Sequence, residues 1–219
     1  MRLVRYGHAC ARIEEDGRAL VVDPGCWTEP AALAGAQAVL ITHEHEDHID
    51  PGPLAAAMAA SPALRVYGPA AALATVVAAA DGAPQSDRLV PVHVGERFDA
   101  AGWSVRAFGG RHAPIWQGRP DVANLSYLVD ERVYVPGDAL VPPGVPVDRL
   151  FVPVHGSWMK TDEAIAFARA VAPRHIHPIH DGQLNERGLR GACAWLAREG
   201  GADFARLPIG GPIELDPGS

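Results

Sequence analysis

The chain has 219 residues, of which 48% are hydrophobic and 21% are charged, and its formal net charge is −7 at pH 7. This length allows one large domain or two small ones, and this composition excludes a disordered chain. No apolar run approaches the roughly 20 residues of a membrane-spanning helix, and the N-terminal segment turns polar too early for a signal peptide. The acidic charge disfavours nucleic acid, which needs a basic surface. We therefore expect a cytoplasmic protein with no nucleic-acid or membrane partner.

The first part of the chain predicts short strands followed by helices. Apolar runs predict strands at residues 2–6, 10–14, 19–22 and 38–42, and Asp16-Gly17 marks a hairpin turn between the second and the third. Pro53 suits the first position of a helix over residues 53–60. A strand at 65–67 and a helix over 70–80 follow, before a turn at Asp81-Gly82.

The second part predicts more strands and two further helices. Strands are expected at residues 89–94, 96–99, 103–108, 124–129, 132–135, 150–154 and 174–177. Thr161 is expected to cap a helix over 162–171, because acidic residues follow it in the first turn, and a last helix spans about 184–198. The irregular stretch 109–122 is the longest, which is typical of a functional loop. Because no linker divides the chain, we expect one domain over 1–219, of the α/β class, with sheets packed face to face and helices outside.

Three of the ten histidines fall within six residues, at His43, His45 and His48. Their segment leaves a buried strand, and strand ends are where a rigid scaffold presents reactive groups. His43 and His45 are two residues apart on near-extended backbone, so their imidazoles point the same way and can bind one metal ion. Asp47 and His48 lie on the turn that follows and can face a second ion. Imidazole and carboxylate are good ligands for zinc, manganese and iron.

The motif His43-x-His45-x-Asp47-His48 after an apolar strand resembles the signature of the metallo-β-lactamase superfamily. Four further elements of that family follow the expected order, at Asp23, His112, Gly137-Asp138 and His180. The opening Tyr-Gly-His-Ala-Cys at residues 6–10 is similar to the branch that includes the ascorbate-6-phosphate lactonase and many uncharacterised metal-dependent hydrolases. The resemblance runs from about residue 6 to residue 180. It implies a four-layer αββα sandwich, the metallo-β-lactamase fold, with metals at one edge of its two sheets.

The resemblance also implies two divalent metal ions, with Zn²⁺ in first place and Mn²⁺ or Fe²⁺ as alternatives. The first ion would be held by His43, His45 and His112. The second would be held by Asp47, His48 and His180, and Asp138 would bridge both. Asp23 would order the ligand loop, since ligand imidazoles usually need a hydrogen-bonding partner. The last ligand has an alternative in His177, because three histidines crowd residues 175–180.

The implied reaction is hydrolysis of a small-molecule lactone, ester or phosphodiester by a hydroxide that the two metals share. Asp47 would orient this nucleophile, and His155 or His8 would protonate the leaving group. His8, Trp116 and Trp158 are candidates to line the substrate pocket.

Two functions of other classes stay open. A metal-dependent nuclease that processes RNA is disfavoured by the charge of −7 and would be favoured by salt-sensitive RNA binding. A non-catalytic metal-binding protein of the same fold would be favoured if metal-replete protein were inert toward many substrates. The sequence does not specify the substrate, and exposed sheet edges leave a homo-oligomer open.

Overall fold

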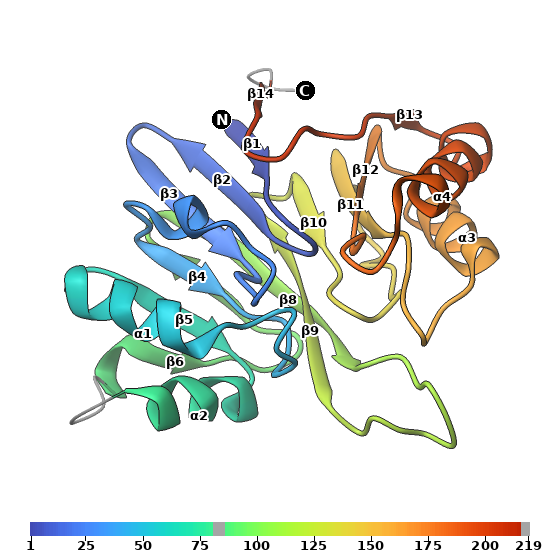
Figure 1. Ribbon diagram of the computed structural model, residues 1–219. Helices are drawn as coiled ribbons and strands as arrows, with labels where there is room; N and C mark the ends of the chain where they lie inside the picture. Colours follow the sequence, from blue (N-terminus) through green and yellow to red (C-terminus); the bar gives the residue numbers. More distant parts are fainter. Residues whose placement is uncertain (81–85, 216–219) are drawn as a thin grey trace.

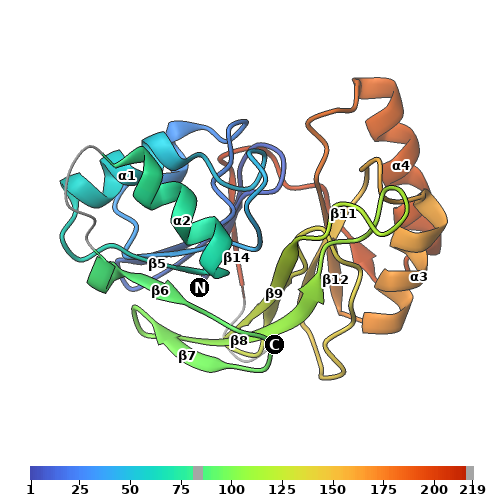
Figure 2. The same cartoon turned by 90° about the horizontal axis from the view of Figure 1, so that it is seen from below.

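A computed structural model describes residues 1–80 and 86–215. Two seven-stranded sheets pack face to face, and a pair of helices covers the outer face of each sheet (Figures 1 and 2). This arrangement confirms the predicted four-layer αββα sandwich. The turn expected at Asp81-Gly82 lies outside the described residues, and the expectation of one domain stays a prediction. None of the helices within the described ranges is long and apolar enough to cross a membrane.

The first sheet has the strand order β14-β1-β2-β3-β4-β5-β6. Its strands are β1 (Arg2–Arg5), β2 (Ala11–Glu15), β3 (Arg18–Val22), β4 (Ala38–Leu40), β5 (Arg65–Gly68), β6 (Leu89–Pro91) and β14 (Pro212–Glu214). The expected hairpin joins β2 to β3, and its two turn residues, Asp16 and Gly17, both have positive φ, as the commonest two-residue hairpin turn requires. From β3 to β6 the pairing is parallel.

The second sheet has the order β13-β12-β11-β10-β9-β8-β7. Its strands are β7 (Arg97–Ala100), β8 (Trp103–Arg111), β9 (Ala123–Val129), β10 (Val133–Val135), β11 (Arg149–Pro153), β12 (His175–Ile179) and β13 (Asp203–Phe204). The strands β7 to β10 are antiparallel, and β10 to β13 are parallel. The described connection between β8 and β9 is residues 112–122, within the long loop that the sequence predicts.

Alternating side chains of the apolar strands enter different layers of the core. Leu20 and Val22 of β3 pack between the two sheets, whereas Val21 packs beneath the helices α1 (Pro51–Ala60) and α2 (Ala70–Ala79). In the second sheet Phe151 faces the space between the sheets, and its neighbours face α3 (Thr161–Val171) and α4 (Glu186–Glu199). Both faces of a central strand are therefore buried, which explains the continuous apolar runs.

Several element boundaries differ from the prediction. Helix α1 begins at Pro51 rather than Pro53, and β6 ends at Pro91. Thr161 is the first residue of α3 rather than its cap, because the carboxylate of Glu163 accepts a hydrogen bond from the backbone N–H of Lys160 at 2.6 Å. Two short 3₁₀ helices, η1 (Pro30–Leu33) and η2 (Ser86–Arg88), and the edge strands β13 and β14 were not predicted.

The topology brings seven strand ends to one edge of the sandwich. Strands β1 and β3 run in the same direction within the first sheet, because each is antiparallel to β2. Strands β8 and β10 share a direction in the second sheet for the same reason, since each is antiparallel to β9. The segments that follow β1, β3, β4, β8, β10, β11 and β12 contain the predicted site residues. Residues that are far apart in the sequence thus meet at the carboxyl ends of these strands.

Candidate metal centre

The first group of metal-ligating side chains contains His43, His45 and His112. Their ligand atoms all lie within 4.8 Å of one another. Nε2 of His43 is 3.0 Å from Nδ1 of His45, and the rings of His45 and His112 are 4.8 Å apart. The structure thus brings together the three residues expected at the first metal.

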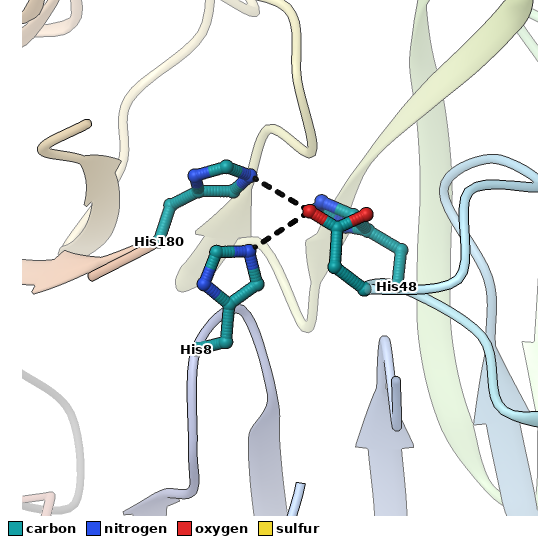
Figure 3. A group of neighbouring side chains, drawn as sticks. His8, His48 and His180 are labelled. Atoms are coloured by element: carbon teal, nitrogen blue, oxygen red, sulfur yellow. Dashed lines mark hydrogen bonds and ion pairs between the residues drawn. The ribbon is translucent and has the colours of Figure 1, made fainter. Parts of the chain in front are cut away.

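The second group contains Asp47, His48 and His180, which come from the loop after β4 and from the end of β12. Nε2 of His48 lies 3.0 Å from Oδ1 of Asp138, and Nε2 of His180 lies 3.2 Å from the same oxygen. Nε2 of His180 is also 3.7 Å from Oδ2 of Asp47. The three residues expected at the second metal therefore converge: the ring centroids of His48 and His180 are 5.3 Å apart, and Figure 3 shows His180 reaching toward His48 from the opposite side.

Asp138 lies between the two groups. Its Oδ1 faces His48 and His180, and its Oδ2 is 3.2 Å from Nε2 of His112. The backbone N–H of Asp138 donates to Oδ1 of Asn124 at 2.9 Å. One oxygen toward each group is the arrangement that a bridging carboxylate needs.

The second nitrogen of three of these imidazoles faces a hydrogen-bond acceptor. Nδ1 of His48 is 2.8 Å from Oδ2 of Asp23, Nδ1 of His112 is 2.6 Å from the carbonyl oxygen of Ala113, and Nδ1 of His180 is 2.5 Å from the carbonyl oxygen of His155. An acceptor at Nδ1 fixes the proton there, which leaves a lone pair on Nε2 for a metal ion. Within residues 1–80 and 86–215, Nε2 of His48, Nε2 of His180 and Oδ1 of Asp138 are buried and form no well-aligned hydrogen bond, although both nitrogens lie within 3.0–3.2 Å of that oxygen. Buried polar atoms are normally paired, so these atoms fit a bound cation.

Asp23 lies beneath the ligand loop, where the sequence predicts it. It is fully buried, its backbone has the left-handed φ of 52°, and it accepts from the backbone N–H and the hydroxyl of Thr42 at 2.8 and 2.7 Å. Because the Thr42 hydroxyl donates its proton to Asp23, its oxygen accepts from Nδ1 of His43 at 3.0 Å. Thr42 and Asn124 were not among the predicted site residues. The position of Thr42 directly before the histidine motif is a signal that could have indicated it.

Burial and neighbouring charges act in opposite directions on the titration of this group. Burial alone would lower the pKa of His48, but the carboxylates of Asp138 and Asp23 outweigh it and raise that pKa well above the usual value. Burial alone would raise the pKa of Asp138, yet the surrounding histidines hold it well below the usual value. Burial, with the charge of His48, lowers the pKa of His43. A metal ion would therefore have to displace a proton from His48, whereas Asp138 is ionised before the metal binds.

Two tryptophans are expected to line the pocket, and the structure places one of them against the ligand group and the other in an exposed position. The indole N–H of Trp158 donates to Oδ2 of Asp138 at 2.8 Å, and its ring contacts those of His112 and His180. Trp158 thus contacts the ligand group itself. Trp116 lies in connection 112–122, where the residue is 71% exposed. Its role toward a substrate stays a prediction.

Three further histidines differ in their relation to the group. His155 is half-buried and contributes its backbone carbonyl to His180, whereas a proton-transfer role for its side chain stays a prediction. His177 is buried within β12, and its Nδ1 is 2.9 Å from the carbonyl oxygen of Ala205. Its contact with the ring of Phe151 places it in the sheet, so the geometry favours His180 as the last ligand. His8 is buried beside Asp47, with Nε2 3.1 Å from Oδ2 of that carboxylate.

Comparisons with known proteins agree with this geometry. The family model of the β-lactamase superfamily domain matches residues 2–180. Protein Rv0786c of Mycobacterium tuberculosis is 39% identical over 186 residues, which cover 82% of this chain and 84% of that protein. A UPF0173 metal-dependent hydrolase of Aeropyrum pernix is 32% identical over 210 residues, or 83% of this chain and 82% of that protein. Among solved structures, the metallo-β-lactamase fold protein YhfI from Bacillus subtilis matches with a TM-score of 0.73 over 97% of this chain and 99% of that chain, at 16% identity.

Proposed function

The chain belongs to the β-lactamase superfamily, and from that premise we propose that it is a metal-dependent hydrolase with two divalent cations. Its substrate would be a small-molecule lactone, ester or phosphodiester. A relative that shares 32% of its residues over most of both chains is named a metal-dependent hydrolase, which supports the general activity. The finer substrate class rests on the resemblance of the opening segment at residues 6–10 to the lactonase branch.

One observation carries this proposal: buried donor atoms converge from the ends of β4, β10 and β12 and face one another without a well-formed hydrogen bond. Nε2 of His48, Nε2 of His180 and Oδ1 of Asp138 form the clearest set in the described part of the chain. Five imidazoles and two carboxylates make up the proposed ligands, at His43, His45, His48, His112, His180, Asp47 and Asp138. This donor set contains no thiolate and suits Zn²⁺, with Mn²⁺ and Fe²⁺ as alternatives.

When bound, the two cations would lower the pKa of water to about 7 and stabilise the negative charge that develops on a substrate oxygen. The side chains of the chain itself have separable tasks. Asp47 would orient an attacking water through its ionised carboxylate. Burial alone would raise its pKa, but the hydrogen bond from His8 and the charge of His48 outweigh burial, and the pKa falls to about 2. The ionised form of Asp47 is therefore present throughout the neutral range.

The remaining parts of the proposal concern the surroundings of the site. Trp158, which contacts both His112 and His180, would form an apolar wall against a small substrate. His155 would donate a proton to the leaving group from its half-buried position. We also keep a cytoplasmic location and the absence of a nucleic-acid partner as parts of the proposal, on the basis of composition and the net charge of −7.

Metal depletion and reconstitution would test the proposal. The purified protein is stripped with a chelator, reloaded with Zn²⁺, Mn²⁺ or Fe²⁺, and assayed against panels of lactones, esters and phosphodiesters. We expect turnover only after reloading and no turnover in His45→Ala, whereas His93→Ala, at an exposed loop position, should behave as the wild type. Turnover that survives chelation, or full activity of His45→Ala, would contradict the proposed function.

A further inference from the structure

His8 lies in the tight connection between β1 and β2, and its side chain contacts the second group of ligands. Its backbone has a φ of 58°, and its side chain is almost completely buried. The ring packs edge-on against Trp27 at 4.7 Å and lies 3.9 Å from the ring of His180. Figure 3 shows the ring of His8 beside those of His48 and His180. By distance alone, His8 belongs to a metal-binding group with Asp47, His48 and His180.

The hydrogen bonds of His8 assign its tautomer. The backbone N–H of Gly182 donates to Nδ1 of His8 at 3.0 Å. A backbone amide nitrogen can only donate, so Nδ1 must present its lone pair and carry no proton. A neutral imidazole has one N–H, which must then be on Nε2. Because Nε2 is 3.1 Å from Oδ2 of Asp47, it donates its proton to that carboxylate.

This tautomer is the opposite of the one found at the proposed ligands. At His48, His112 and His180 the nitrogen away from the centre faces an oxygen acceptor, so that Nε2 is free to bind a cation. At His8 the nitrogen away from the centre faces a donor, so that Nε2 is protonated and has no lone pair to offer. We propose that His8 is neither a metal ligand nor a substrate contact, but a positioning residue whose Nε2–H fixes the carboxylate of Asp47 at the second metal.

The surrounding backbone holds His8 in this role. The carbonyl oxygen of His8 accepts from the backbone N–H of His180 at 2.9 Å, and Arg5 forms a buried ion pair with Asp181. The connection after β1 is thus tied to the segment that contains the last proposed ligand. Gly182 has no room for a side chain there, because a Cβ atom would lie 2.9 Å from Nδ1 of His8 and 2.8 Å from the ring of Trp27. The absence of that side chain lets the amide of Gly182 approach the ring.

The inference rests on the proposed metal centre, and its test measures a tautomer and an affinity rather than turnover. In the ¹⁵N spectrum of the ring nitrogens of zinc-loaded protein, we expect His8 to carry its proton on Nε2 and to have an unprotonated Nδ1. A His8 that is protonated on Nδ1 and has a metal-bound Nε2 would overturn the inference.

Variants of His8 provide the second readout. His8→Phe keeps an aromatic ring but has no donor, and we expect Zn²⁺ to bind about 10–100-fold more weakly at the second site, as for other partners of metal ligands, while the first site keeps its affinity. His8→Gln retains an N–H near the position of Nε2 and should recover most of this loss. The control is His93→Phe, at an exposed residue.

Competition with a chromophoric chelator measures both affinities. Unchanged affinity in His8→Phe, or loss of the second ion in His8→Gln as complete as in His48→Ala, would refute the positioning role. A metal-replete protein that hydrolyses nothing would instead refute the proposed function and leave the assignment of His8 intact.

Discussion

Asp23→Asn is the substitution that tests most sharply how the ligand loop is organised. Asp23 accepts three hydrogen bonds, from the backbone N–H of Thr42, from the Thr42 hydroxyl and from Nδ1 of His48, at 2.8, 2.7 and 2.8 Å. Asparagine has nearly the same shape, but it replaces one acceptor oxygen by an NH₂ donor. Either orientation of the amide therefore places one donor against another.

The size of the effect follows from these two orientations. If the NH₂ group faces His48, then Nδ1 of His48 must become the acceptor, and the proton moves to the Nε2 atom that should bind the metal. If the NH₂ group faces the backbone of Thr42, a buried N–H is left unpaired, which costs about 1–3 kcal/mol. Loss of such a partner typically weakens metal binding by about 10–100-fold. We expect the second site to weaken more than the first, because His43 is linked to Asp23 only through Thr42.

Chelator competition on the purified variant gives both dissociation constants. The matched control is Asp16→Asn, at an exposed turn residue whose positive φ asparagine also tolerates. Unchanged affinity at both sites in Asp23→Asn would show that Asp23 does not set the tautomer of His48.

Three further substitutions have expected outcomes. Trp158→Phe removes the indole N–H that donates to Asp138 at 2.8 Å and leaves that carboxylate less restrained, so metal affinity should fall by about tenfold or more. The control is Trp195→Phe, at an exposed residue. Equal metal affinities in the two variants would contradict a role of Trp158 in holding Asp138. Gly137→Ala adds a Cβ atom 2.5 Å from Oδ1 of Asn124 at a φ of 62°, so it should lower the free energy of unfolding, measured in urea, by more than Gly17→Ala, which has positive φ but open space. For His177, burial lowers the pKa to about 4. The unfolded chain binds the proton first, so His177 alone should contribute about 3 kcal/mol to the stability that the metal-free protein loses between pH 6.5 and pH 4. His177→Gln should therefore lose less stability over this range, and equal losses in the two proteins would refute this.

The layers of the fold could be predicted from the sequence because the strong signals are local. Runs such as Leu20-Val21-Val22 send alternate side chains to two buried layers, and the turn at Asp16-Gly17 separates two such runs. The strands β13 and β14 have no such signal. They contain two and three residues, which are only half-buried or exposed. They form because β12 and β1 offer free edges for pairing, and that condition is not local.

The proposed ligands could be chosen from the sequence because each follows an apolar strand, in an order that resembles a known family. The roles of the residues that hold these ligands in place could not be predicted in this way. The partner of His8 is the amide of Gly182, 174 residues away, and the partner of Trp158 is a carboxylate in another segment. A tautomer depends on whether such a distant neighbour donates or accepts, and no local pattern contains that information.

Anomalous diffraction from crystals of the zinc-loaded protein tests the central claim most directly. The account predicts two zinc peaks for each chain. One should lie against His43, His45 and His112, the other against Asp47, His48 and His180, and Asp138 should contact both. A single peak, or a second peak bound by His177 or by Nε2 of His8, would contradict the account.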